Sequence, residues 1–197
     1  MANYNAIKYD GFSKGSTTLI KTLTASSSAT LSFVDGTSSV VLDSTYKEYL
    51  FIFNNIHPAT NNATFDFNIS IDSGSNYNVA KTTTFFRAQH GENGAGAELG
   101  YETSMDLAQG TGVQNITQST GNGNDESSSG YLHLFNPSST TFVKHFIATS
   151  SSYQGSDYQY QSFVGGYGNT TSAVDAIQFS MSSGNIDAGD ICLYGIN

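Results

Sequence analysis

Short apolar or alternating runs recur along the chain, and each is bounded by Gly, Ser, Asn or Asp. In residues 65–71, two Phe and two Ile alternate with Asp, Asn and Ser, which predicts a strand with one face in the core and one in water. Comparable runs predict ten strands, at residues 17–23, 29–34, 49–56, 65–71, 77–87, 130–135, 142–149, 160–164, 173–181 and 191–196, and an ambiguous segment described below would add an eleventh.

Two segments depart from this simple pattern. Residues 49–56 (YLFIFNNI) do not alternate, which predicts either a central strand covered on both faces or a strand at a subunit contact. In residues 97–110, Glu98, Glu102 and Asp106 recur every four residues, as on one face of a helix. The same acids also alternate with apolar neighbours, and repulsion between like charges four apart disfavours the helix. We therefore expect a strand there, with its acids facing solvent.

The strand spacing and the turn signals between the runs predict an all-β fold, an antiparallel two-sheet β-sandwich that is jelly-roll-like. Residues 136–139 (NPSS) predict a hairpin turn, because Pro presets φ and Asn accepts a local hydrogen bond. The polar residues 110–129 predict a long loop. Residues 1–16 have the composition of a short extended N-terminal arm, and residues 17–197 that of a single domain.

Composition excludes several classes of function. Of the 197 residues, 13% are aromatic and only 12% are charged, which favours a folded domain over disorder. Seven basic residues against 16 acidic ones give a net charge of −9, so no basic stripe for nucleic acid is expected. No apolar run is long enough to span a membrane, and the amino terminus lacks the features of a signal peptide. We expect neither nucleic acid nor membrane as a partner.

Motifs for catalysis match only in part. Residues 11–15 fit G-x-S-x-G and residues 44–47 fit S-x-x-K, but the strand, helix and partner motifs that give these patterns their chemistry are missing. The single Cys192 lies in an apolar run with no adjacent base, and it allows neither an intrachain disulfide nor a Cys-based zinc site. The sequence therefore predicts a protein that is not an enzyme and has no cofactor.

Metal-binding patterns are equally incomplete. His133 and His145 fall nearly opposite each other on the two arms of the predicted hairpin and could share a metal, but no third ligand is evident. The turns at residues 72–76 and 122–126 carry oxygen ligands that would suit Ca²⁺, yet neither has EF-hand spacing. Turn chemistry alone explains them, and we expect no metal site.

Aromatic residues provide the candidate contacts. Tyr153, Tyr158, Tyr160 and Tyr167 lie within a stretch rich in Gly, Ser and Gln, a composition typical of adaptable recognition surfaces for glycan or protein. Packing within the core and between subunits explains the same run, and Phe163 and Val164 are its expected buried members. In the N-terminal arm, the expected partner-binding residues are the three aromatic ones, Tyr4, Tyr9 and Phe12.

The end of the chain, SMSSGNIDAGDICLYGIN, places a strand, a Gly-Asn turn and a final strand in succession. With the hairpin FDFNISIDSGSNY and the short polar arm, it resembles structural proteins of tailed bacteriophages, particularly marine phages. Similar modules in such families decorate the capsid, often as trimers, or form fibre and receptor-binding parts of the tail. The resemblance implies no catalytic residues.

We therefore expect a non-enzymatic virion structural protein on the particle exterior, made in the host cytoplasm. The favoured role is a capsid decoration (cement) protein that binds the major capsid protein or other virion proteins and self-associates, with a homotrimer favoured. The chain is short and has neither the heptads nor the β-helical repeats of a fibre shaft. The alternative is a tail-fibre or receptor-binding, lectin-like module that recognises host cell-surface glycan.

Overall fold

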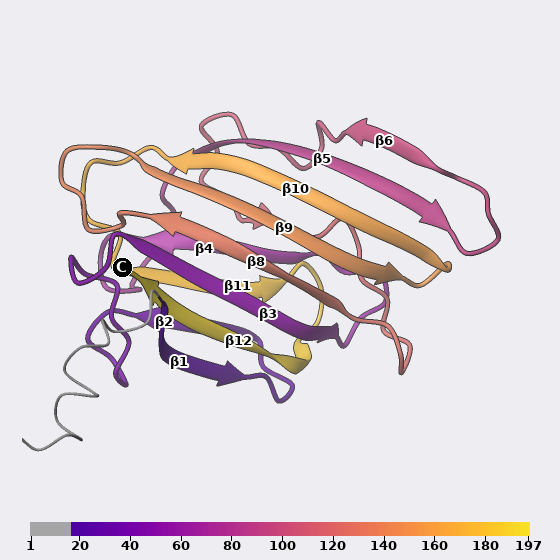
Figure 1. The fold of residues 1–197 in the computed structure, drawn as a ribbon, viewed down its shortest axis with the longest axis horizontal. Helices are drawn as coiled ribbons and strands as arrows, with labels where there is room; N and C mark the ends of the chain where they lie inside the picture. Colours follow the sequence, from indigo (N-terminus) through magenta and orange to yellow (C-terminus); the bar gives the residue numbers. More distant parts are fainter. Residues whose placement is uncertain (1–16) are drawn as a thin grey trace, which may run out of the picture.

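The computed structural model describes residues 17–197, which form twelve strands in two antiparallel sheets (Figure 1). The larger sheet has eight strands, in the order β1 (Thr17–Thr24), β12 (Ile186–Ile196), β3 (Glu48–Pro58), β8 (Ser128–Phe135), β9 (Lys144–Gln154), β10 (Tyr158–Gly168), β5 (Lys81–Gly91) and β6 (Glu98–Tyr101). The smaller sheet has four, in the order β2 (Thr30–Val34), β11 (Ala176–Met181), β4 (Phe65–Ser70) and β7 (Gln114–Asn115). Within the described residues, no helix is long and apolar enough to cross a membrane.

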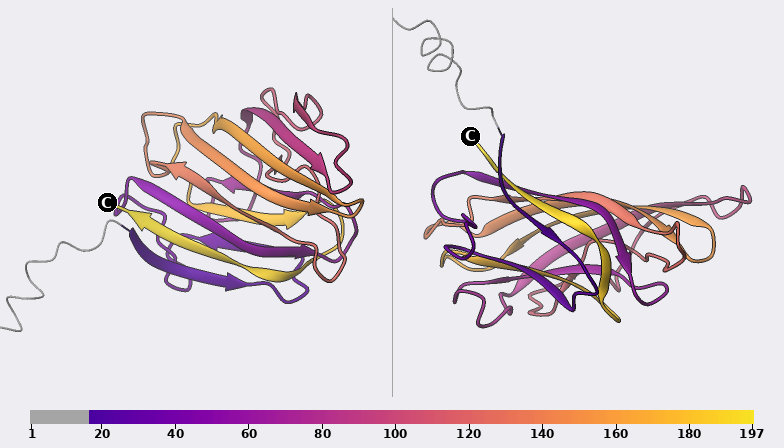
Figure 2. Two further views of the ribbon diagram at one scale, coloured as in Figure 1. Left: turned by 45° about the vertical axis from the view of Figure 1, so that its right-hand side comes forward. Right: turned by 90° about the horizontal axis from the view of Figure 1, so that it is seen from below.

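The chain winds as a jelly roll. Strands β1, β12, β3 and β8 are neighbours in the larger sheet, and β2, β11, β4 and β7 follow the same order in the smaller one. Along the chain, these eight strands therefore change layer at every step except from β4 to β7, which both lie in the smaller sheet, and the two layers can be followed in Figure 2. This is the winding of eight strands into a double-sheet jelly roll and confirms the predicted fold class.

Two insertions widen the larger sheet beyond that eight-stranded frame. β5 and β6 are inserted between β4 and β7, and β9 and β10 between β8 and β11. All four join the larger sheet beyond β8, in the order β9-β10-β5-β6. The larger sheet therefore has twice as many strands as the smaller one.

Aromatic side chains fill the space between the two sheets, and we call this region the aromatic core. Phe179 of β11 lies at its centre, with ring centroids 5.3–6.3 Å from those of four other phenylalanines, Phe33, Phe51, Phe53 and Phe65. All five rings are at most 2% exposed. Alternation in β3 produces this arrangement, because every second residue of the strand points toward the smaller sheet.

Residues 105–120 hold a second buried layer, which we call the polar seam. Hydrogen bonds tie this segment to β4, β5, β9 and β10: Asn68 Nδ2 to Thr111 O, Asn115 Nδ2 to Asp66 Oδ1, Thr83 Oγ1 to Gln114 Oε1, Ser150 Oγ to Ile116 O, and Gln118 N to Ser162 Oγ. The side chains of β4, β5, β9 and β10 in these bonds are all at most 6% exposed. The segment thus covers the inner face of the widened sheet where the smaller sheet ends.

The structure bears out most of the predicted strands. All ten appear, although β5 begins four residues later than expected. The predicted strand at residues 97–110 covers only β6, and Glu102 pairs with Arg87 instead of facing solvent freely. The expectation that β4 has one wet face is wrong, because the polar seam and residues 72–81 cover Asp66, Asn68 and Ser70. The expected loop at residues 110–129 contains the two-residue strand β7.

Candidate functional site

The outer face of the larger sheet, turned away from the smaller sheet, carries a continuous row of uncharged side chains. One residue from each strand lies directly opposite its neighbour, from β1 to β6: Thr22, Cys192, Ile52, Tyr131, Thr149, Phe163, Phe86 and Tyr101. We call this set the cross-sheet row. Directly opposed side chains on one face of a sheet contact each other, so the row forms one surface.

Aromatic residues at the β8–β6 end of the row are open to solvent. Phe163, Tyr131 and Phe86 are 36%, 42% and 41% exposed, and Tyr101 is 51% exposed. The rings of Phe86 and Phe163 stack, with centroids 4.8 Å apart and planes 12° from parallel. Phenylalanine is typically an interior residue, and exposed apolar groups that form one patch typically mark an interaction site.

A second row runs beside the cross-sheet row, and it makes the surface of the face uneven. It consists of Leu19, Tyr194, Leu50, His133, Ile147, Gly165 and Thr84. Ile147 is 53% exposed, whereas Gly165 opposite it has no side chain. Hollows of about 480 and 310 Å³ lie on either side of Ile147, and a third of about 410 Å³ lies between Ile52 and His133. The face therefore presents protruding apolar side chains next to depressions of similar chemistry.

Charge is absent from both rows, since neither contains Asp, Glu, Lys or Arg. This neutrality contrasts with the net charge of −9 on the chain. A polar hollow of about 320 Å³ adjoins the face where β9 turns into β10, and its lining includes Glu92, Ser151, Tyr153 and Gln159. The two rows are thus uncharged, and carboxylates lie at their margins, where Glu48 is 3.9 Å from His133 and Asp106 accepts the hydroxyl of Tyr101.

Strand alternation divides the predicted tyrosine surface between two faces. Tyr153 and Tyr167 lie on the outer face, and Tyr167 is beside His145, with ring centroids 5.9 Å apart. Tyr158 and Tyr160 lie on the opposite face of β10 and stack with centroids 6.2 Å apart. The four tyrosines therefore do not form one binding surface.

Phe163 shows the same effect of alternation. It was expected to be buried together with Val164, and only Val164 is, at 2% exposure. Adjacent residues of a strand point to opposite faces, so both could not enter the same core.

Arg87 anchors the two inner tyrosines. Its guanidinium lies 5.5 Å from the ring centre of Tyr160, and its Nε pairs with Glu102 Oε1 at 2.6 Å. Glu98 approaches the same guanidinium at 3.5 Å. Burial of the phenol is the main cause that raises the pKa of Tyr160 above its usual value. This cluster holds β6 against β5.

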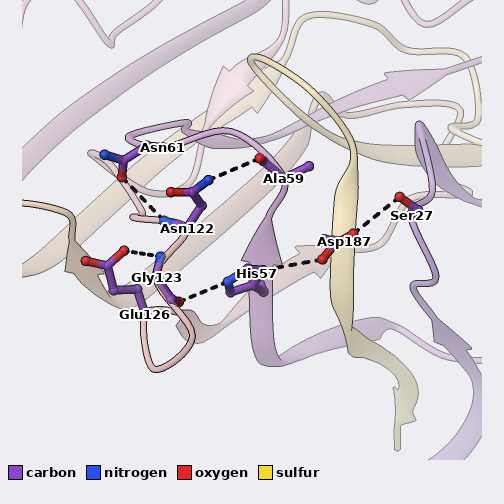
Figure 3. Close-up of polar contacts among 8 residues, drawn as sticks. All are labelled: Ser27, His57, Ala59, Asn61, Asn122, Gly123, Glu126 and Asp187. Carbon is purple, nitrogen blue, oxygen red and sulfur yellow. Dashed lines mark hydrogen bonds and ion pairs between the residues drawn. The ribbon is translucent and has the colours of Figure 1, made fainter.

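A second polar cluster surrounds His57 at the end of β3 (Figure 3). His57 Nε2 donates to Gly123 O at 3.1 Å, and its Nδ1 lies 3.9 Å from Asp187 Oδ2. Ser27 Oγ donates to the other oxygen of Asp187. In a catalytic triad, the serine would donate to His57 Nε2. Here Ser27 donates to the carboxylate of Asp187, and Nε2 bonds Gly123 O. The cluster ties residues 121–127 to β3 and β12 and is not arranged for nucleophilic catalysis.

The predicted oxygen-rich turns close on themselves. Glu126 Oε2 accepts the backbone N–H of Gly123. The carboxylate of Asp72 accepts hydrogen bonds from the backbone N–H and from the side-chain amide of Asn76. Hydrogen bonds from Asn76 are the main cause that lowers the pKa of Asp72 to about 2. His133 lies opposite Ile147, so the structure does not bring it together with His145 as a metal pair. No set of three or more His, Cys, Asp or Glu side chains within residues 17–197 is placed to hold a metal.

The remaining candidate residues from the sequence lie in different parts of the chain. Tyr4, Tyr9, Phe12 and the G-x-S-x-G match lie outside the described residues. Cys192 is half-buried within the cross-sheet row, where Thr22 Oγ1 contacts its sulfur at 3.5 Å. The S-x-x-K match lies in the loop before β3, and its Lys47 is exposed.

Comparisons with known proteins identify no relative. No family model, no curated protein and no solved structure matches this chain.

Sequence reasoning did not find the cross-sheet row, although one signal pointed to it. The lack of alternation in residues 49–56 predicted either full burial or a subunit contact, and Ile52 of that strand lies half-exposed in the row. Its neighbours Tyr131 and Cys192 are 79 and 140 positions further along the chain. Such register between distant strands is a property of the folded sheet and is not visible in local periodicity.

Proposed function

We propose that this protein is a non-enzymatic structural module that binds other protein subunits through the outer face of its larger sheet. The observation that carries the proposal is the cross-sheet row, which crosses all eight strands without a charged residue and exposes four aromatic side chains at its β8–β6 end. Copies of a chain with a net charge of −9 repel one another at long range, and the two uncharged rows are where that repulsion costs least. Aromatic side chains there provide large contact area per residue.

In its specific form, the proposal is a phage capsid decoration protein that self-associates, with trimers favoured, and binds the outer shell. The resemblance of residues 65–77 and 180–197 to tailed-phage proteins supports this form. The jelly-roll winding and the exposed outer face of the larger sheet also support it. A protein repeated over a shell gains affinity from many simultaneous contacts, so each contact can be modest. Quantitative mass spectrometry of particles that contain the protein should find hundreds of copies per particle. About a dozen copies would refute decoration.

The outer face can be tested directly by its effect on assembly. Phe163→Asp places a charge in the exposed aromatic part of the cross-sheet row, and we expect it to convert an oligomeric wild type into monomers in sedimentation velocity experiments. Phe142→Asp is the matched control, because Phe142 is 69% exposed in the loop before β9, away from the row. The two variants should keep the same circular dichroism spectrum. A wild type that stays monomeric, or an F163D variant that still assembles, would contradict self-association through this face.

A second candidate function rests on the polar hollow near the β9–β10 turn. Serine hydroxyls, the Gln159 amide and the Tyr153 ring gather there, which suits a hydroxyl-rich ligand such as a glycan. Tyr153→Ala should abolish binding on a glycan array, whereas a Tyr158→Ala/Tyr160→Ala double variant, altered on the opposite face, should retain it. Binding that survives Tyr153→Ala, or no binding by the wild type, would exclude this reading.

A further inference from the structure

A buried lysine in the structure has no acidic partner. Lys81, the first residue of β5, is fully buried, and its Nζ donates to Asn68 Oδ1 at 2.5 Å and to Val79 O at 2.9 Å. Both oxygens are neutral, and no ion pair to Lys81 exists within residues 17–197. A buried ammonium without a counter-ion is costly, so burial shifts the equilibrium of this group toward the unprotonated amine.

The side chain of Asn68 is held in place beside this amine. Its Nδ2 donates to Tyr77 O and to Thr111 O, and its Oδ1 also accepts the N–H of Ile69 at 2.9 Å. Asn68 is only 5% exposed. Burial lowers the pKa of Lys81 to about 8, so about a tenth of the amines are unprotonated at pH 7. A nucleophile and a polarised carbonyl group are therefore fixed next to each other away from bulk water.

We propose that Lys81 Nζ and Asn68 Cγ join in an intramolecular isopeptide bond. The lone pair of the neutral amine attacks Cγ, and the N–H of Ile69 stabilises the developing negative charge on Oδ1. The Cγ–Nδ2 bond then breaks, a proton from Nζ passes to the departing nitrogen, and ammonia leaves. The step needs no oxidant or other reactant. Fixed proximity is what accelerates it, since an oriented intramolecular attack has a very high effective concentration.

This bond would staple the two sheets of the sandwich. Asn68 lies in β4 of the smaller sheet and Lys81 in β5 of the larger one. The chain has a single cysteine, so it cannot form an intrachain disulfide. An isopeptide bond would give the sandwich a covalent cross-link that reducing conditions do not open. The inference is independent of what the outer face binds.

Lys144 provides an internal control. It is also fully buried, and its Nζ also donates to two oxygens, Phe142 O and Thr170 O. Both are backbone carbonyls, so within residues 17–197 this amine makes no hydrogen bond to a side-chain amide. Burial lowers the pKa of Lys144 as well. Lys144 should therefore remain a free amine.

The test is the mass of the denatured full-length wild type after prolonged incubation at mildly alkaline pH. We expect a mass lower by about 17 Da, the mass of one ammonia. After unfolding, an amine-labelling reagent should modify Lys144 but not Lys81. Trypsin should fail to cleave after Lys81 and release residues 48–87 as one peptide that carries the loss. Loss of ammonia with a labelled Lys81 would mean that Asn68 had cyclised on its own backbone, and it would overturn the proposal.

Variants locate the bond. Lys81→Met and Asn68→Ala should both restore the full mass, and Lys144→Met should keep the loss of about 17 Da. Because the wild-type mass is decisive, the test does not depend on whether a variant folds. A wild type at full mass, with Lys81 and Lys144 labelled equally after unfolding, would refute the isopeptide bond.

Discussion

Phe179 of the aromatic core and Ser150, which bonds the polar seam from β9, are both at most 2% exposed, but their surroundings differ in kind. Phe179 packs against four aromatic rings, whereas Ser150 makes one hydrogen bond, from its Oγ to Ile116 O at 2.8 Å. Hydrophobic burial is proportional to area and gives large stabilisation. A hydrogen bond mostly replaces one that water made in the unfolded chain, so its net contribution is modest.

The two regions therefore contribute differently to the molecule. The aromatic core supplies most of the stability where two sheets face each other. The polar seam allows β9, β10 and β5 to extend past the smaller sheet, because residues 105–120 satisfy the polar groups that would otherwise be buried without partners. That extension carries Phe163 and Phe86, so the seam is what gives the outer face its full width.

The largest effect should come from the aromatic core. Phe179→Ala should lower the free energy of unfolding by about 3–5 kcal/mol, because it removes a central ring and leaves a cavity among four others. Urea denaturation measures the difference. Phe142→Ala, at an exposed position, should change it by less than about 0.5 kcal/mol. Similar losses for the two variants would show that Phe179 is not the centre of the core.

Asp66, which accepts a hydrogen bond from Asn115 of the polar seam, allows a test of the electrostatics of this region. Its carboxylate is 1% exposed and accepts bonds from Thr64 and Asn115, and burial is the main cause that raises its pKa from 3.8 to about 6. The folded state therefore binds the proton more tightly than the unfolded chain. The resulting stabilisation is present below pH 3.8 and is lost as the pH rises through 6.

Asp66→Asn removes this titration and keeps an oxygen that can accept both hydrogen bonds. The stability of D66N relative to wild type should rise by up to about 3 kcal/mol between pH 4 and pH 7, as expected for a shift of about two pKa units. Urea denaturation at several pH values measures it. A difference that does not change with pH would contradict a buried, proton-binding Asp66.

The contrast also explains how far the sequence could predict the structure. Core strands such as β3 and β11 were recognisable, because apolar runs bounded by turn residues directly encode strands that pack between sheets. The polar seam was not, since the local pattern of β4 looks the same whether Asp66 and Asn68 face water or a distant segment. Alternation alone separates tyrosines only within one strand. Tyr153 and Tyr158 lie on different strands, so their assignment to opposite faces also depends on the register that the turn between β9 and β10 sets.

The smallest effect should come from a single bond of the polar seam, and two adjacent serines of β9 allow a matched test. Ser150 points inward and bonds Ile116 O, whereas Ser151 is exposed on the outer face. Ser150→Ala should lower the free energy of unfolding by about 1 kcal/mol, because it removes the donor and leaves a buried carbonyl without that partner. Ser151→Ala, the same chemical change one residue later, should have almost no effect.

Hydrogen exchange adds a local readout to this pair. Residues 105–120 are held mainly by such bonds, so Ser150→Ala should speed amide exchange there while exchange in β3 and β11 stays unchanged. If Ser150→Ala instead destabilised the protein as strongly as Phe179→Ala, the seam would be part of the core in energetic terms. The extension of the larger sheet would then depend on the same cooperative packing as the jelly-roll frame, and the outer face could not loosen without unfolding the whole domain.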